Sequence, residues 1–260
     1  MKRRDFIHRV SIATGVTLVG ITVSTLCEAV ASDGKADWGY TGNEGPENWG
    51  RLSGEYQVCQ TGTQQSPIDL EQAVESDFST FNIEYSDIPL KILNNGHTIQ
   101  VNAEPGSMLM LNDTAFELQQ LHFHTPSEHT VKDETFPMEV HFVHQSAEGK
   151  LAVLGVFLKE GQFNRDLQPI WDAMPARKQS ETLVKGVGVA IATLLPKVQS
   201  TYRYFGSLTT PPCSEVVQWV VFQEALEISQ AQIDQFRQIF PLNARPVQPL
   251  NRQFLPKEVF

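Results

Sequence analysis

Basic residues are scarce in this sequence. Its 20 lysines and arginines are outnumbered by 30 aspartates and glutamates, which gives a formal net charge of −10 at pH 7. A surface of this kind repels nucleic acid and anionic lipid, so neither is expected as a partner. The sequence also lacks an internal repeat, a linker and a low-complexity tract. We therefore expect one domain with one large core, and no feature indicates an oligomeric state.

No stretch is long and apolar enough to make a strong membrane span. The uncharged stretch from Val10 to Leu26 contains glycine, serine and threonine, follows a basic start and precedes Ala29-Val30-Ala31, a typical cleavage pattern. We predict that residues 1–31 are a cleavable export signal and that residues 32–260 form the mature domain. A retained membrane anchor is the weaker alternative.

The type of signal and the destination follow from neighbouring residues. Arg3-Arg4 resembles the start of a twin-arginine signal, which carries folded proteins across the bacterial membrane. Leu26 stands before Cys27, where a lipoprotein signal needs a small residue, so lipid attachment is not expected. The mature protein is expected in the periplasm or secreted, without stable membrane association.

Only two cysteines, Cys59 and Cys213, remain once the signal is removed. In an oxidising compartment an even pair this far apart predicts one disulfide bond. Two buried free thiols are the alternative.

Short apolar runs rich in isoleucine, valine and leucine predict a mainly β fold. The expected strands are 90–93, 98–102, 108–111, 116–124, 138–145, 151–158, 202–205 and 216–222. Helical spacing is restricted to 164–174 and 229–240, each ended by a proline. Residues 33–66 have no sustained period and predict an irregular arm. These patterns predict a mostly antiparallel sheet with a few short peripheral helices.

Five of the seven histidines lie between Leu118 and Gln145. If both ends of this stretch are strands, residues two apart share a face, so Gln120, His122 and His124 form one row. Glu139, His141 and Val143 form a second row, and an antiparallel return brings the two rows together.

Three neutral imidazoles give a tetrahedral zinc ion one open position for water, as in a catalytic site. We therefore predict that His122, His124 and His141 bind Zn²⁺, and that Gln120 and Glu139 accept hydrogen bonds from the ligand rings. His144 has the opposite strand parity to His141 and should face away. His129 lies in the connecting loop, and both are expected to make structural hydrogen bonds.

Several motifs occur in a fixed order along the chain. They are Gln-x-His-x-His at 120–124, Ser-Glu-His at 127–129, Glu-x-His-x-Val-His at 139–144 and Ser-Leu-Thr-Thr-Pro-Pro at 207–212. This order resembles the α-class carbonic anhydrases of the exported bacterial type. Matching blocks at 38–40, 45–49, 65–68, 94–97, 151–155, 243–246 and 251–253 extend the resemblance over nearly all the mature chain. It implies a large twisted sheet, mainly antiparallel, with one zinc ion at the bottom of a conical cleft.

The resemblance also implies an activity, the reversible hydration of carbon dioxide to bicarbonate and a proton through attack by zinc-bound hydroxide. In such a site Thr209 accepts a hydrogen bond from the hydroxide and donates to an ionised Glu128, while Thr210 contacts the bound anion. The apolar wall that holds carbon dioxide would consist of Val143, Val153, Leu208 and Trp219.

Proton export is likewise implied by the resemblance. His97 falls at the position of the family's proton shuttle, and an ordinary imidazole pKa near 6.5 would suit that role. Tyr40, Asn95 and Gln100 would order the connecting waters. Cys59 and Cys213 match the disulfide of exported members, which would brace the Thr209-Thr210 loop, and Arg245 is expected to support the same loop.

Two rival interpretations remain from the sequence. His-x-His-x₃-Glu at 122–128 also fits a cupin, in which Glu128 would bind iron or manganese, although the glycines of that pattern are missing. A non-catalytic binding domain of the same fold is the second, although such domains lose zinc ligands and this chain retains all three.

Overall fold

The computed structural model describes residues 36–71, 73–75, 81–198, 200–251 and 253–257. The predicted export signal lies outside the described residues. More of the described residues lie in β-strands than in helices. The strands are β1 (Val74–Glu75), β2 (Phe81–Glu84), β3 (Ile88–Asn94), β4 (Ile99–Asn102), β5 (Met108–Leu111), β6 (Thr114–His124), β7 (Thr130–Val131), β8 (Glu134–Thr135), β9 (Met138–Ser146), β10 (Leu151–Glu160), β11 (Gln179–Val189), β12 (Thr201–Gly206), β13 (Val217–Phe222), β14 (Leu226–Ile228) and β15 (Pro256–Lys257).

The helices are short. They are η2 (Gly42–Glu44), α1 (Trp49–Leu52), η3 (Gly54–Tyr56), α2 (Val58–Thr61), α3 (Gln168–Ala173), η4 (Ile191–Leu194) and α4 (Gln230–Ile239), where η denotes a 3₁₀ helix. Within the described ranges, no helix has both the length and the apolar character needed to cross a membrane.

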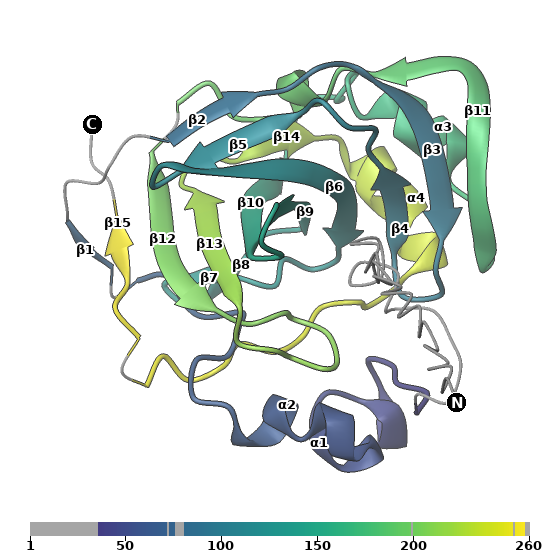
Figure 1. Cartoon of the computed structure of the whole chain (residues 1–260). Coiled ribbons are helices and arrows are strands. Elements are labelled where there is room, and N and C mark those ends of the chain that lie inside the picture. The colour runs from purple at the N-terminus through teal and green to yellow at the C-terminus, as the bar shows by residue number, and fades with distance from the viewer. Residues whose placement is uncertain (1–35, 72, 76–80, 199, 252, 258–260) are drawn as a thin grey trace, which may run out of the picture. The chain divides into compact units, whose positions relative to one another are not determined.

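Thirteen strands form one sheet, with the order β1-β15-β12-β13-β10-β9-β6-β4-β3-β11 and with β14, β2 and β5 paired off this path. Figure 1 shows β9 and β10 near its middle and β11 at an edge. Among the strands of the described residues, the pairings β1·β15, β10·β13 and β10·β14 are parallel and the other strand pairings are antiparallel. The predicted fold class, a mostly antiparallel sheet with short peripheral helices, is therefore confirmed.

Several elements were not predicted, among them the short strands β1, β2, β7, β8, β14 and β15. The edge strand β11 was not predicted, because nearly all its residues are exposed and it has no apolar alternation. The arm expected to be irregular contains η2, α1, η3 and α2, which are too short to produce a helical period.

The two predicted helices are present with adjusted ends. Helix α4 begins after Ser229, which forms a capping box with Gln232. Helix α3 begins later than predicted, because the Asn164 side chain accepts hydrogen bonds from the backbone N–H groups of Asp166 and Leu167 and forms a turn there.

The sheet separates an apolar core from a polar face. Phe123 on β6 packs its ring 5.0 Å from Trp171 of α3 and 6.1 Å from Phe236 of α4, in the core. A bulge between Leu118 and Gln120 inserts one residue into β6. The bulge precedes the His-x-His pair, so the alternation that sends His122 and His124 to the other face is kept.

Candidate metal centre

The two predicted rows face each other across β6 and β9. His122 is the register partner of His141, with Gln120 opposite Val143 and His124 opposite Glu139. Residues directly opposite on one face of an antiparallel pair lie close together. The sheet register therefore brings the three candidate ligands to one place.

One ring nitrogen of each candidate ligand is held by a hydrogen-bond acceptor. His122 Nδ1 lies 2.9 Å from Gln120 Oε1, and His141 Nε2 lies 2.9 Å from Glu139 Oε1. His124 Nδ1 lies 2.7 Å from the backbone oxygen of Asn243. These contacts fix each ring and leave His122 Nε2, His124 Nε2 and His141 Nδ1 as the remaining nitrogens.

The remaining nitrogens suit a metal ion. The ligand atoms that the three histidines offer lie within 4.8 Å of one another. His124 Nε2 is fully buried without a hydrogen-bond partner, a costly arrangement unless something binds it. Burial lowers the pKa of all three rings, that of His124 to about 4, so they are neutral and can donate lone pairs at neutral pH.

A second group of metal-ligand type, His129, Glu139 and His141, is a hydrogen-bonded cluster instead. Glu139 Oε1 lies 2.8 Å from His129 Nδ1 and 2.9 Å from His141 Nε2. Two ligands of one tetrahedral zinc ion stand about 3.3 Å apart when each bond is about 2.0 Å. The shorter separations are those of hydrogen bonds.

Glu139 is a buried carboxylate surrounded by N–H donors. Its Oε2 accepts from the backbone N–H groups of Glu128 and His129, both at 2.9 Å. Burial alone would raise the pKa of Glu139, but electrostatic interactions and hydrogen bonds with His129 and His141 outweigh it and hold that pKa well below the usual value. Glu139 is therefore ionised.

Glu128 lies beside the three candidate ligands but does not belong to the group that could bind a metal ion. Its Oε1 accepts from the backbone N–H of Arg245 at 2.9 Å, and its Oε2 lies 3.9 Å from His141 Nδ1 with no hydrogen-bond partner. Burial raises the pKa of Glu128 to about 7, while His141, the Arg245 N–H and the Thr209 hydroxyl act to lower it. The Thr209 hydroxyl therefore lies near the Glu128 carboxylate, but Glu128 Oε2 accepts no hydrogen bond in this structure.

Comparisons with known proteins agree with this geometry. The family model for eukaryotic-type carbonic anhydrases matches residues 44–257. A carbonic anhydrase of Nostoc is 44% identical over 242 residues, covering 91% of this chain and 92% of the relative. One of Pectobacterium carotovorum is 41% identical over 242 residues, covering 93% and 98%. The solved α-carbonic anhydrase of Thermovibrio ammonificans, in complex with the inhibitor sulfanilamide, superposes with a TM-score of 0.83 at 42% identity, covering 87% of this chain and all of that one.

This chain belongs to the α-carbonic anhydrase family. It is a carbonate dehydratase, an enzyme class that reversibly hydrates carbon dioxide. Enzymes of this family use zinc, and the three histidines whose remaining nitrogens converge form a group that could hold a metal ion. The cupin alternative is not supported, since neither metal-capable group among the described residues includes Glu128.

The predicted apolar wall of this carbonic anhydrase follows the register of three strands. Val143 on β9 pairs with Val153 on β10, which pairs with Trp219 on β13. All three side chains are buried. Val143 lies two residues after His141 on β9, so this row is next to the row of candidate ligands. Leu208 and Thr210 are half-buried in the loop after β12, where the backbone N–H of Cys213 bonds to the Thr210 oxygen.

The environment of His97 differs from the expectation. Its ring stacks on Trp38 with centroids 3.7 Å apart and planes 7° apart. Burial and, to a smaller extent, Lys178 lower the pKa of His97 to about 4, although Asp37 opposes them. The expected value near 6.5 is therefore wrong for this conformation, because the sequence does not reveal that Trp38 covers the ring.

The three residues expected to order water lie near this site. Asn95 Oδ1 accepts from the backbone N–H of His97 at 2.9 Å, and its Nδ2 donates to Gln100 at 3.3 Å. Gln100 is the register partner of His122. Burial and the Glu128 charge raise the pKa of Tyr40 well above its usual value, so its hydroxyl stays protonated.

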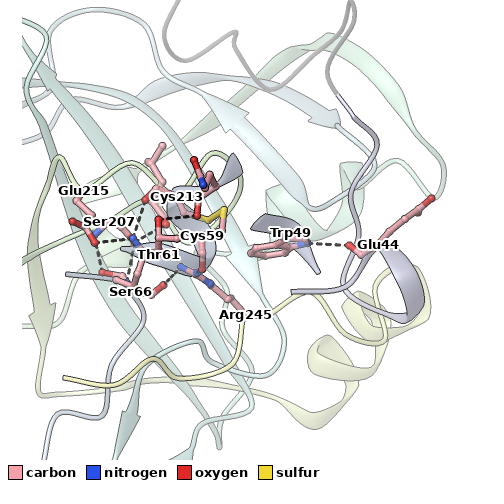
Figure 2. The surroundings of a disulfide bond; sticks show 12 residues. Glu44, Trp49, Cys59, Thr61, Ser66, Ser207, Cys213, Glu215 and Arg245 are labelled. Atoms are coloured by element: carbon pink, nitrogen blue, oxygen red, sulfur yellow. Dashed lines mark hydrogen bonds between the residues drawn. A yellow bond between two sulfur atoms is a disulfide. The ribbon is translucent and has the colours of Figure 1, made fainter. Parts of the chain in front are cut away.

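The predicted disulfide is confirmed. Cys59 and Cys213 are joined by a bond of 2.07 Å, as Figure 2 shows. Because Cys59 lies in helix α2, the bond ties the loop that contains Thr210 to that helix. Arg245 supports this region differently from the expectation: its guanidinium donates to the backbone oxygens of Ser66 at 2.7 Å and Cys59 at 2.9 Å. It therefore reaches the threonine loop through Ser66, which bonds to Ser207, and through the disulfide.

Two residues of the site were missed by the sequence analysis. Asn243 accepts from His124 through a backbone oxygen, and its side-chain Nδ2 donates to the backbone oxygens of His97 and Phe123. Backbone acceptors have no residue signature, although the matching block at 243–246 was a signal. Tyr204, 2.7 Å from His129, had no signal beyond an ordinary strand position.

Proposed function

We propose that this carbonic anhydrase holds one Zn²⁺ with His122 Nε2, His124 Nε2 and His141 Nδ1, and uses it to hydrate carbon dioxide. The observation that carries the proposal is the buried His124 Nε2, which has no partner and stands beside the other two free nitrogens. Gln120, Glu139 and the Asn243 oxygen would orient the ligand rings.

Zinc, when bound, would lower the pKa of a water molecule so that hydroxide is available near neutral pH; carbonic anhydrase is itself the reference example, with a value of about 7. Thr209 would accept a hydrogen bond from the attacking hydroxide and donate its own hydrogen to Glu128. This requires an ionised Glu128, which a nearby zinc charge would favour. Thr210 would contact the bicarbonate product.

Carbon dioxide would lie against the row formed by Val143, Val153 and Trp219, with Leu208 closing its side. An apolar wall suits a substrate without net charge and excludes ordered water from its place. Bicarbonate, being charged, binds such a wall less well and would leave.

His97 would export the proton through water ordered by Tyr40, Asn95 and Gln100. Stacked on Trp38, the ring is a weak proton acceptor because its pKa is about 4. The role therefore requires the ring to leave Trp38 and become hydrated. His97→Ala should lower turnover in weak buffer and recover with added imidazole, measured by stopped-flow hydration. Unchanged turnover, or no recovery, would contradict the role.

We also propose that residues 1–31 are removed on export and that residues 32–260 act in the periplasm or outside the cell. The disulfide supports an oxidising compartment. Mass spectrometry of the protein recovered from that compartment should show a chain that begins at Ser32. A chain that retains Met1 would contradict the proposal.

The main experiment combines metal analysis with stopped-flow carbon dioxide hydration on the purified mature chain. We expect one zinc per chain, hydration well above the buffer rate and inhibition by sulfanilamide, the inhibitor in the Thermovibrio ammonificans complex. His122→Ala should lose zinc and activity together. Stoichiometric zinc without hydration would indicate the non-catalytic domain, and full activity in His122→Ala would overturn the ligand assignment.

A further inference from the structure

The loop between β12 and β13 carries Thr209, which the proposed function places beside the reacting atoms. A backbone hydrogen bond joins the two limbs of this loop, from the Leu208 N–H to the Ser214 oxygen at 3.0 Å. Leu208 comes directly before Thr209 in the chain. The position of the threonine therefore depends on how the returning limb of the loop, residues 213–216, is held.

Glu215 links the returning limb to the segment that follows helix α2. Its Oε1 accepts hydrogen bonds from the backbone N–H of Gln64 at 2.6 Å and from Gln65 Nε2 at 3.0 Å. These partners lie 151 and 150 positions away in the sequence. Figure 2 shows Glu215 near the disulfide bond. Hydrogen bonds to a carboxylate are stronger than those between neutral groups, so this side chain can hold the limb in place.

Gln65 joins this link to the disulfide-bonded residue of the loop. Its Nε2 donates to Glu215 Oε1 and also to the backbone oxygen of Cys213 at 3.1 Å. Gly62 leaves room for the arrangement, because a Cβ there would collide with both Gln65 Nε2 and Glu215 Oε1. The disulfide thus holds Cys213 while the carboxylate holds Glu215. Ser214, whose oxygen supports the other limb, is fixed from both sides.

We propose that Glu215 is a positioning residue for Thr209. Its carboxylate fixes the returning limb, and the Ser214 oxygen then holds the Leu208 N–H. The Thr209 hydroxyl is thereby kept beside Glu128. The inference rests on the proposed function, in which Thr209 takes part in carbon dioxide hydration. A misplacement of about 1 Å caused by a change far from the chemistry can cost about 100-fold in rate, and losing one of two links should cost about tenfold.

Glu227 in β14 is a matched control. Its Oε2 accepts a hydrogen bond from the backbone N–H of Gln162 at 3.1 Å, 65 positions away in the sequence. It also packs on a glycine, since a Cβ on Gly161 would lie 2.7 Å from Glu227 Cδ. Glu215→Ala and Glu227→Ala therefore remove the same kind of link between distant segments, and only the first link holds the loop that carries Thr209.

Stopped-flow hydration, zinc content and urea unfolding are measured on wild type and the two alanine variants. We expect Glu215→Ala to lower kcat/KM about tenfold while keeping the zinc content of wild type, because Glu215 supports the loop and not the ligand histidines. Glu227→Ala should change kcat/KM less than about twofold at a similar loss of stability, since its link lies outside the loop. Equal losses of activity in the two variants would overturn the inference.

Two milder variants keep the test valid if Glu215→Ala does not fold. Glu215→Gln retains an acceptor oxygen for both partners and should recover most of the activity. Glu215→Asp keeps the charge but shortens the side chain by one methylene, so it should lower kcat/KM about threefold. Recovery by the amide and loss with the shorter acid are what a positioning contact predicts. Wild-type activity in Glu215→Asp would overturn the inference.

A double-mutant cycle tests whether Glu215 acts through Thr209. Thr209→Val removes the hydroxyl and, by the proposed function, most of the hydration rate. In that background Glu215→Ala should lower kcat/KM by less than about twofold more, because the group it positions is already gone. Losses that multiply in full would overturn the inference and leave the proposed function standing. Full activity in Thr209→Val, or a wild-type chain without hydration, would overturn the proposed function and this inference with it.

Discussion

The two faces of strand β9 each carry a buried histidine, and they treat it differently. On the core face both nitrogens of His144 are paired, Nδ1 with the Ala152 oxygen at 3.3 Å and Nε2 with the Tyr85 hydroxyl at 2.7 Å. On the other face Glu139 holds Nε2 of His141, while Nδ1 has no closer acceptor than Glu128 at 3.9 Å.

Burial is therefore not what distinguishes a metal ligand here, since both rings are almost fully buried. The distinction is the number of ring nitrogens left without a partner. A buried ring nitrogen without a hydrogen-bond partner costs free energy. Its presence beside two other unpaired ring nitrogens therefore indicates a position where a metal ion binds. Paired nitrogens indicate a histidine that contributes to packing.

The strongest test of this comparison makes the same substitution on both faces. Loss of a hydrogen-bond partner of a metal ligand lowers metal affinity about 10- to 100-fold. His141→Gln removes a ligand itself, so it should lower zinc affinity by more than this and abolish carbon dioxide hydration. His144→Gln should retain both while losing about 1–3 kcal/mol of unfolding free energy from disrupted buried hydrogen bonds. Zinc titration, stopped-flow hydration and urea unfolding check the pair. Zinc loss in His144→Gln would remove the distinction.

The core-face histidine should also make stability depend on pH. Burial, opposed by hydrogen bonds to the backbone, lowers the pKa of His144 to about 4 from 6.5. Between these values the unfolded chain binds a proton that the folded chain does not, so this contribution to stability is complete above pH 6.5 and is lost as pH falls toward 4.

The full shift corresponds to about 3 kcal/mol, with a slope of at most about 1.4 kcal/mol per pH unit. Urea unfolding of the metal-free protein from pH 7 to 4 should therefore show a smaller slope for His144→Gln than for wild type. Using metal-free protein avoids the loss of zinc on protonation of its ligands. Identical slopes would mean that His144 is protonated alike in both states.

On the metal face, the predicted support of His141 can be weakened without touching a ligand. Glu139→Gln replaces a carboxylate, which only accepts hydrogen bonds, with an amide that has one NH₂ group. That NH₂ must face either the backbone N–H groups of Glu128 and His129 or the rings of His129 and His141, so donor would meet donor. Zinc affinity should fall about 10- to 100-fold with all three ligands present. Chelator competition measures it, and an unchanged affinity would show that the outer partner has no influence on the metal.

The pairing of the two histidine rows could be predicted because a strand repeats every two residues and both rows obey that period. The bulge in β6 did not interfere, since its extra residue comes before Gln120. Thr209 and Glu128 are different: no period or spacing marks them, and only the family resemblance singled them out.

A residue's environment cannot be predicted from sequence where neighbours far along the chain determine it. Trp38 changes the pKa of His97 by covering its ring, and Asn243 supports His124 through a backbone atom. The edge strand β11 pairs with β3 alone and buries little, so hydrophobic alternation does not reveal it. Contacts of these kinds are set by tertiary packing and leave no local pattern.

Gly155 is the least conspicuous part of the metal face and gives the smallest expected effect. It is the register partner of His141, and a methyl group there would lie 2.9 Å from Glu139 Oε1, closer than a carbon and an oxygen normally approach. Gly155→Ala should therefore displace the carboxylate and weaken zinc binding by severalfold, about 1 kcal/mol.

Gly188 in β11 is the matched control, because a Cβ there meets only the Ile88 oxygen at 3.5 Å, an ordinary contact. Gly188→Ala should leave zinc affinity unchanged and alter unfolding free energy by less than about 1 kcal/mol. If both alanine variants bind zinc like wild type, Glu139 has more freedom than its four N–H partners imply, and the metal face is less rigid than the comparison with the core face requires.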